Sequence, residues 1–135
     1  MKEKRQIKFR GKYRLPFHEV EKPNVPFWVY GSLIVIGEEV CDIVEQDGNI
    51  RRDILPDTVG QFTGLHDKNG KDIYEGDIVQ LNEFVYEVGY DDKRFASFVL
   101  LRKQDMFKHY FGEALEANQV DIIGNIHDNP ELLSK

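Results

Sequence analysis

The chain has 135 residues, of which 41% are hydrophobic and 12% aromatic, and this predicts a globular protein of one domain or two small lobes. Its one cysteine excludes an intramolecular disulfide, and a reducing cytoplasm is the simplest location. No apolar run approaches the ~18 residues of a membrane span, and the basic N-terminus lacks the apolar stretch of a secretory signal, so we expect no membrane partner.

Charge is distributed unevenly. Residues 1–14 carry a net charge of +6 within a chain of net charge −6, which leaves −12 for residues 15–135. An acidic body disfavours binding to nucleic acid, which depends on neutralising phosphates. The basic segment can still bind nucleic acid or an acidic partner, and the candidate residues are Lys8, Arg10, Lys12 and Arg14. Their alternation with Ile7 and Phe9 is more typical of a half-buried strand with a solvated face.

The first half of the chain predicts short antiparallel strands. An irregular loop is expected where three prolines lie between residues 15 and 26, and Gly31 is a candidate bulge. The expected strands are Gln6–Tyr13, Phe27–Ile36, Val40–Gln46 and Ile50–Leu55. A boundary near Pro56 predicts two domains, an N-terminal β lobe at 1–57 and a second lobe at 58–135.

The second half predicts a β meander. Strands joined by tight polar turns favour a small closed antiparallel barrel of the SH3-like type, so the fold class is mainly β, or α+β. The expected barrel strands are Asp77–Leu81, Phe84–Tyr90, Phe95–Leu101 and Val120–Ile126. Apolar pairs at i, i+4 predict one inserted helix between Lys103 and Ala117. A one-turn helix is expected at Asn129–Leu133, with Pro130 in the first helical position.

The most specific segment is Val59–Val79, which reads VGQFTGLHDKNGKDIYEGDIV. Asn69-Gly70 predicts a hairpin turn of type I′, with positive φ at both residues. The acidic and amide residues around it resemble a calcium loop only superficially, because the glycine falls at the wrong position. The histidines also lack zinc-ligand spacing, so we expect no metal and no cofactor.

Candidate catalytic groups are few. Glu75 and Asp77 can act as a pair of carboxylates, but Gly76 between them favours a turn in which an aspartate caps backbone amides. Cys41 lies in an apolar strand and is more typical of a small buried hydrophobe than of a nucleophile. We therefore expect no enzymatic activity.

Four aromatic residues form a candidate partner-binding surface on the predicted barrel. Small barrels use such side chains to grip peptides or to stack bases, although the same residues more often fill a small core. The four residues are Tyr74, Phe84, Tyr86 and Tyr90.

Several segments together resemble one family. They are Ile7–Lys12 (IKFRGK), Trp28–Leu33 (WVYGSL), the long Val59–Val79 segment, and Ile122–Leu133 (IIGNIHDNPELL). The chain resembles the YopX protein family, small proteins of phages and prophages. The resemblance implies a phage-related cytoplasmic protein with an SH3-like portion, and it brings no activity and no catalytic residues.

Two functional hypotheses follow from these observations. The first is a non-enzymatic protein-binding or assembly module that engages an unidentified protein or associates with itself as a homo-oligomer. Self-association is expected because the apolar character of Phe27–Ile36 requires cover on both faces. The second, less favoured hypothesis is a nucleic-acid-binding accessory factor that uses the basic segment and barrel aromatics.

Overall fold

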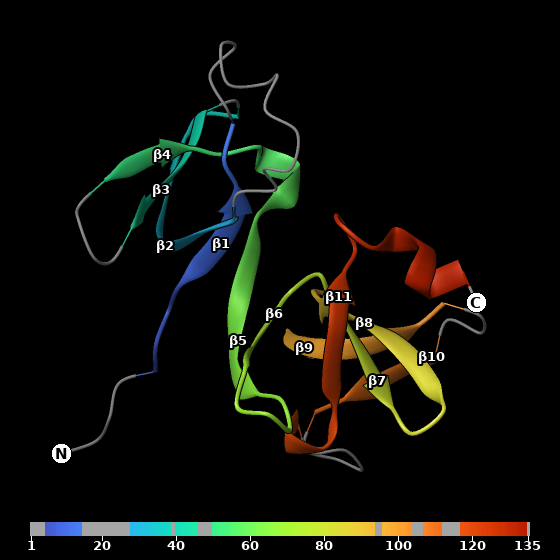
Figure 1. Ribbon diagram of the computed structural model, residues 1–135. Helices are drawn as coiled ribbons and strands as arrows, with labels where there is room; N and C mark the ends of the chain where they lie inside the picture. The colour runs from blue at the N-terminus through green and yellow to red at the C-terminus, as the bar shows by residue number, and fades with distance from the viewer. Residues whose placement is uncertain are drawn as a thin grey trace, which may run out of the picture. The chain divides into compact units, whose positions relative to one another are not determined.

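The structure is a computed structural model that describes residues 5–14, 28–38, 40–45, 50–93, 96–103, 107–111 and 117–134 (Figure 1). The chain divides into two compact units, Met1–Gln61 and Phe62–Lys135. The named strands pair in antiparallel fashion throughout, so the expectation of a mainly β fold is confirmed. The helical segments of the described residues are short 3-10 turns.

The first unit is built on four strands in the order β4-β3-β2-β1. Their bounds are β1 (Phe9–Lys12), β2 (Trp28–Ile36), β3 (Val40–Glu45) and β4 (Arg51–Asp53). The 3-10 turn η2 (Pro56–Thr58) follows, and the first residues of β5 (Gly60–His66), Gly60 and Gln61, pair with β1.

The core of this unit lies on one face of the strands. It consists of buried Val29, Cys41, Ile43 and Ile54. The strand β2 alternates over its first half, where Val29 is buried and Tyr30 is 46% exposed. Gly31 is needed for a close approach, because a Cβ there would lie 1.9 Å from the Val44 carbonyl oxygen on β3.

The residues that follow β1 and β4 pair with each other, which joins these two strands at their C-terminal ends. Tyr13 forms an isolated bridge with Ile54, and the Arg14 N–H donates to the Asp53 carbonyl at 2.7 Å. The hydroxyl of Thr58 accepts from the backbone of Lys12 at 2.8 Å, which ties η2 to β1. The edge of β4 is therefore partly covered by the chain itself.

The second unit contains the rest of β5, paired with β6 (Asp72–Tyr74), and a five-stranded sheet in the order β10-β9-β8-β7-β11. The bounds of the sheet strands are β7 (Asp77–Leu81), β8 (Phe84–Asp91), β9 (Ser97–Arg102), β10 (Phe107–Tyr110) and β11 (Asp121–Asn125). The turns η3 (Ala117–Gln119) and η4 (Pro130–Ser134) flank β11. The core consists of buried Ile73, Val79, Tyr86, Val88, Leu100 and Val120.

The expected helix between Lys103 and Ala117 is wrong, because β10 occupies the middle of that range. Tyr110 pairs with Val99 on β9, which gives the segment ladder hydrogen bonds and a place in the sheet. The i, i+4 apolar spacing therefore does not decide the structure here. Residues 104–106 and 112–116 of the predicted helix lie outside the described residues.

Two further expectations have mixed outcomes. The barrel is not closed in the part of the chain that the structure describes, because no ladder joins β10 to β11 and the five strands form an open sheet. The one-turn helix is confirmed as η4, with Pro130 in the first position. The side chain of Asn129 accepts from the backbone of Asn125 at 3.2 Å and thereby closes the preceding turn.

Candidate functional site

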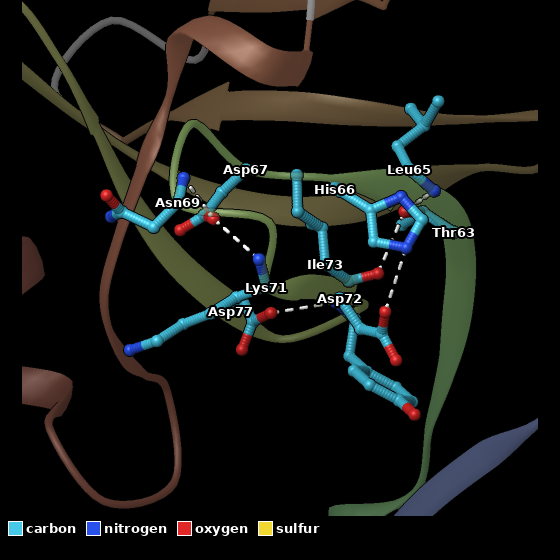
Figure 2. A network of polar contacts seen from close by, with 10 residues as sticks. Thr63, Leu65, His66, Asp67, Asn69, Lys71, Asp72, Ile73 and Asp77 are labelled. Atoms are coloured by element: carbon cyan, nitrogen blue, oxygen red, sulfur yellow. Dashed lines mark hydrogen bonds and ion pairs between the residues drawn. The ribbon is translucent and has the colours of Figure 1, made fainter.

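The hairpin between β5 and β6 is the centre of the polar network in Figure 2. The Gly70 N–H donates to the Asp67 carbonyl at 3.0 Å, and the Asp67 N–H donates to the Lys71 carbonyl at 2.8 Å. Gly70 has φ +82°, whereas the φ of Asn69 is not positive. The expected type I′ turn is therefore wrong: only Gly70 adopts the left-handed conformation, and the loop is longer than two residues.

The carboxylate of Asp67 organises this loop. Its Oδ1 accepts from the backbone N–H groups of Asn69 and Lys71, both at 2.9 Å (Figure 2). Its Oδ2 accepts from the Ile122 N–H on β11 at 3.2 Å. Asp67 is only 3% exposed, and burial by itself would raise the pKa of the carboxyl. The three backbone donors, with the charge of Lys71, outweigh burial and lower the pKa below its ordinary value.

The same loop docks onto β11. The Lys68 N–H donates to the Val120 carbonyl at 2.9 Å, and the Asn69 side-chain amide donates to Asp121 at 3.0 Å. Together with the bond from Asp67, these contacts cover the start of β11. Both carboxylate oxygens of Asp67 thus already accept hydrogen bonds from backbone N–H groups. Among the described residues, no group of side chains is arranged to hold a metal ion.

A bulge lies just before the loop. Phe62 pairs with Tyr74 and His66 pairs with Asp72, so three residues of β5 face one residue of β6. The Thr63 hydroxyl donates to the Ile73 carbonyl at 2.8 Å and accepts from Leu65 at 3.1 Å, which replaces the missing ladder bonds (Figure 2).

The imidazole of His66 forms a contact of 3.0 Å between Nε2 and Asp72 Oδ1, beside the bulge (Figure 2). The side chain of His66 is 55% exposed, and the edge of its ring also meets Phe62. A surface contact of this kind positions the histidine and adds little stability.

Asp77 serves the next turn. Its Oδ2 accepts from the Tyr74 N–H at 2.7 Å, and the residue is 2% exposed. The interpretation as a turn residue is confirmed for Asp77, and a catalytic pair with Glu75 gains no support. Cys41 is buried, as expected of a small hydrophobe, and burial together with Asp42 and Asp53 raises the pKa of its thiol.

The four basic candidates lie along β1 and the residues flanking it, and the structure engages most of them internally. Arg10 is 7% exposed and its guanidinium lies 4.8 Å from the centre of the Trp28 ring. The ammonium of Lys12 lies 5.7 Å from the same ring, and Arg14 pairs with Asp53 at 3.3 Å. Lys8 is half-buried. The arrangement matches a strand packed through its basic side chains better than an open phosphate-binding row.

The four aromatic candidates divide into two pairs. Tyr74 and Tyr86 are each 3% exposed and belong to the core, so their rings do not present a binding surface. Phe84 and Tyr90, at the two ends of β8, are 43% and 46% exposed. The Tyr90 ring stands edge-on to Phe98 with 5.2 Å between ring centres.

One buried carboxylate was missed by the sequence reasoning. Asp91, whose side chain is 1% exposed, accepts from the Tyr110 hydroxyl at 2.6 Å and lies 3.9 Å from the Lys108 ammonium. These contacts tie β10 to β8 across β9. The sequence around Asp91 predicts only a polar turn between two expected strands, and the helix expected at 103–117 placed Tyr110 on the wrong element.

The segments that carry the family resemblance contact one another in pairs. Ile7–Lys12 and Trp28–Leu33 contribute β1 and β2, which form a ladder. The Val59–Val79 segment meets the C-terminal segment where the Ile126 N–H donates to the Gly76 carbonyl at 2.9 Å. These motif residues build turns and strand contacts, which defines a small antiparallel β protein whose polar network is architectural.

Comparisons with known proteins identify this class more closely. The family model described as "YopX protein" matches residues 29–134, most of the chain, so the chain belongs to the YopX protein family. The crystal structure of protein EF1440 from Enterococcus faecalis is similar, with a TM-score of 0.51 and 22% identity over 95% of this chain and 98% of that chain. At that identity the likeness shows the fold alone. No curated protein matches the chain.

A membrane-crossing helix is not found in the described part of the chain, where helical segments are 3-10 turns of at most five residues.

Proposed function

We propose that the chain is a non-enzymatic accessory protein of a phage or prophage, acting in the cytoplasm as a protein-binding module. The observation that carries the proposal is the exposure of Phe84 and Tyr90 on the second unit, 43% and 46%. Aromatic side chains of this kind are enriched at protein interfaces and supply much of the binding energy there.

The state of the polar groups supports a binding role over catalysis. Asp67 and Asp77 direct their carboxylates at backbone N–H groups, and Asp91 is bonded to Tyr110. Carboxylates committed to such structural bonds are poor general acids or bases, because proton transfer would break the loop that they hold.

The exposed aromatic residues Phe84 and Tyr90, here called the Tyr90 surface, have a geometry suited to a protein ligand. Tyr90 lies directly opposite Phe98 on β9, and the two rings form an edge-to-face pair. A rigid pair of this kind offers apolar area at low entropic cost, with a phenol hydroxyl for hydrogen bonding. Phe84 stacks under the Arg102 guanidinium at 4.6 Å, which adds a cation at the other end of the strand.

A capture experiment tests this proposal. Immobilised protein is exposed to nuclease-treated bacterial lysate, and the bound proteins are compared with those of a Tyr90→Ser, Phe84→Ser variant. We expect a specific protein to be captured by the native chain and lost with the variant. Gln80→Ser, a change at an exposed polar position on β7, is the matched control and should retain it. Equal capture by all three proteins would contradict the assignment of this surface.

The alternative function, binding of nucleic acid, is separated by repeating the capture with lysate that has not been treated with nuclease. Retention that disappears with nuclease, or that weakens steeply as salt rises, would favour it. The burial of Arg10 and the ion pair of Arg14 argue for the protein-binding role.

A further inference from the structure

The second half of β2 is a sheet edge in the described residues. β1 pairs with β2 only from Trp28 to Gly31. On the same side of β2, none of the described residues forms a ladder with the stretch from Ser32 to Ile36, although β3 pairs with its other side.

The hydrogen-bonding direction of β3 can be read from its contacts with β4. The Cys41 carbonyl accepts from Ile54 at 2.8 Å, and the Glu45 N–H donates to the Ile50 carbonyl at 2.9 Å. Because alternate residues of a strand direct their backbone groups to opposite sides, Asp42, which follows Cys41, directs its groups toward β2.

The register then fixes which residues of β2 face outward. Asp42 lies opposite Ile34. The residues on either side of Ile34, Leu33 and Val35, therefore direct their N–H and C=O groups away from β3, toward the open side of β2. A ligand at this edge has to be an extended strand, because only a strand matches that row of donors and acceptors.

The side chains at this edge are apolar and exposed. Val35 is 61% exposed and Ile36 is 56% exposed, and they point to opposite faces because they are adjacent in the strand. Protein edges are commonly protected by charges, prolines or covering loops. The edge of β11 is protected by the covering loop, where the Asp67 carboxylate accepts a hydrogen bond from the Ile122 N–H. The stretch Leu33–Ile36, by contrast, contains neither a charge nor a proline.

We propose that this edge binds the same stretch of a second copy of the chain, antiparallel about a two-fold axis at Val35. In this register Val35 faces Val35 of the other copy, Ile34 faces Ile36, and Gly31 keeps its partner Phe9. The pairing is isologous, which closes the assembly at two copies.

The chemistry of the edge also favours a second copy of the chain as its partner. The partner strand has to be apolar on both faces, and β2 itself supplies such a strand. This surface lies in the first unit and is independent of the Tyr90 surface in the second.

Sedimentation equilibrium of the purified chain tests the proposal. We expect a mass of twice 15.8 kDa at micromolar concentration. Val35→Lys should weaken association by about a hundredfold or more, because it would place two ammonium groups directly opposite each other across the pairing. Ile50→Lys changes an apolar residue of 46% exposure away from this edge and should leave the dimer unchanged.

The contrary outcomes are equally specific. A mass of 15.8 kDa for the native chain across the whole concentration range overturns the proposal. A dimer that persists in Val35→Lys, with an unchanged thermal melt, also overturns it. The Tyr90→Ser, Phe84→Ser variant should remain dimeric, so that loss of partner capture and loss of self-association are distinguishable.

Cross-linking tests the register. Val35→Cys should form a covalent dimer rapidly with oxidised glutathione, because Cα atoms paired across antiparallel strands lie within disulfide reach. The native chain is the control, since Cys41 is 5% exposed. Cross-linking of Ile50→Cys at the same rate as Val35→Cys would contradict the two-fold axis at Val35.

Discussion

Replacing Asp67 by alanine should destabilise the protein more than any change at an exposed aspartate. The substitution leaves three backbone N–H groups without their acceptor, those of Asn69, Lys71 and Ile122. Water can replace the carboxylate at the two loop residues, whereas Ile122 lies in the half-buried strand β11. Loss of a side-chain acceptor for orphan backbone donors costs about 0.5–2 kcal/mol each. Three such donors would cost about 1.5–6 kcal/mol together, and because water can replace the carboxylate at two of them we expect a loss of about 2–4 kcal/mol.

Chemical denaturation with urea and thermal melting measure this effect. For a chain of 135 residues a change of 1 kcal/mol corresponds to about 3–5 °C, so the melting temperature should fall by about 6 °C or more. Asp92→Ala, in the exposed turn after β8, is the matched control and should stay within about 0.5 kcal/mol. A change below about 0.5 kcal/mol for Asp67→Ala would refute the assignment of the carboxylate as the organiser of the loop.

The pH dependence gives the same residue a second signature. The pKa of Asp67 is lowered in the folded protein, so the unfolded chain binds a proton more readily. Its contribution to stability is therefore fully present above the ordinary aspartate pKa of about 3.9 and is lost as pH falls through the folded value. Asp67→Asn should melt with a smaller difference between pH 7 and low pH than the native protein. An equal difference in both proteins would contradict this linkage.

The remaining predictions concern other positions. Gly70→Ala should lose about 1–2 kcal/mol through strain at φ +82° alone, because nothing lies within 4 Å of a Cβ there, and Gly70→Asn should lose less; equal loss would argue against strain. Gly31→Ala should be more damaging than Gly70→Ala in urea denaturation, because its Cβ would strike the Val44 carbonyl at 1.9 Å. Lys8→Gln with Arg10→Gln should leave any captured protein partner unchanged, and retention on DNA–cellulose that this change abolishes would instead support the nucleic-acid role.

Much of the strand content follows from local sequence. The expected strands at Phe27–Ile36, Val40–Gln46, Asp77–Leu81 and Phe84–Tyr90 agree with β2, β3, β7 and β8 within a few residues. Apolar residues alternate with polar ones in several of these segments, and turn residues separate them, which are signals that act over a few residues. The family segments were also visible in the sequence, and the family is now shown.

The sequence does not show which of the candidate binding residues are buried and which are exposed. Tyr86 and Tyr90 lie on the same face of β8, yet Tyr86 is buried and Tyr90 is 46% exposed. The difference depends on what covers each end of the strand, which is a property of contacts between distant segments. For the same reason Arg10 reads as a solvated cation in the sequence but lies against Trp28 in the structure.

The β class, the positions of most strands, the cap that Asp77 supplies to its turn and the positive φ of Gly70 could be predicted from the sequence, because they depend on neighbours within a few residues. The family could be predicted as well, from the motifs that carry the resemblance. Contacts between distant segments, by contrast, make 107–110 a strand and bring Asp67 to the N–H of Ile122, 55 residues further along the chain. Pairing with β9 outweighs a local helical pattern, since each strand residue gains ladder bonds and burial that an isolated helix lacks. A buried carboxylate likewise becomes favourable only when enough donors reach it, and for Asp67 one of these donors comes from the distant strand β11.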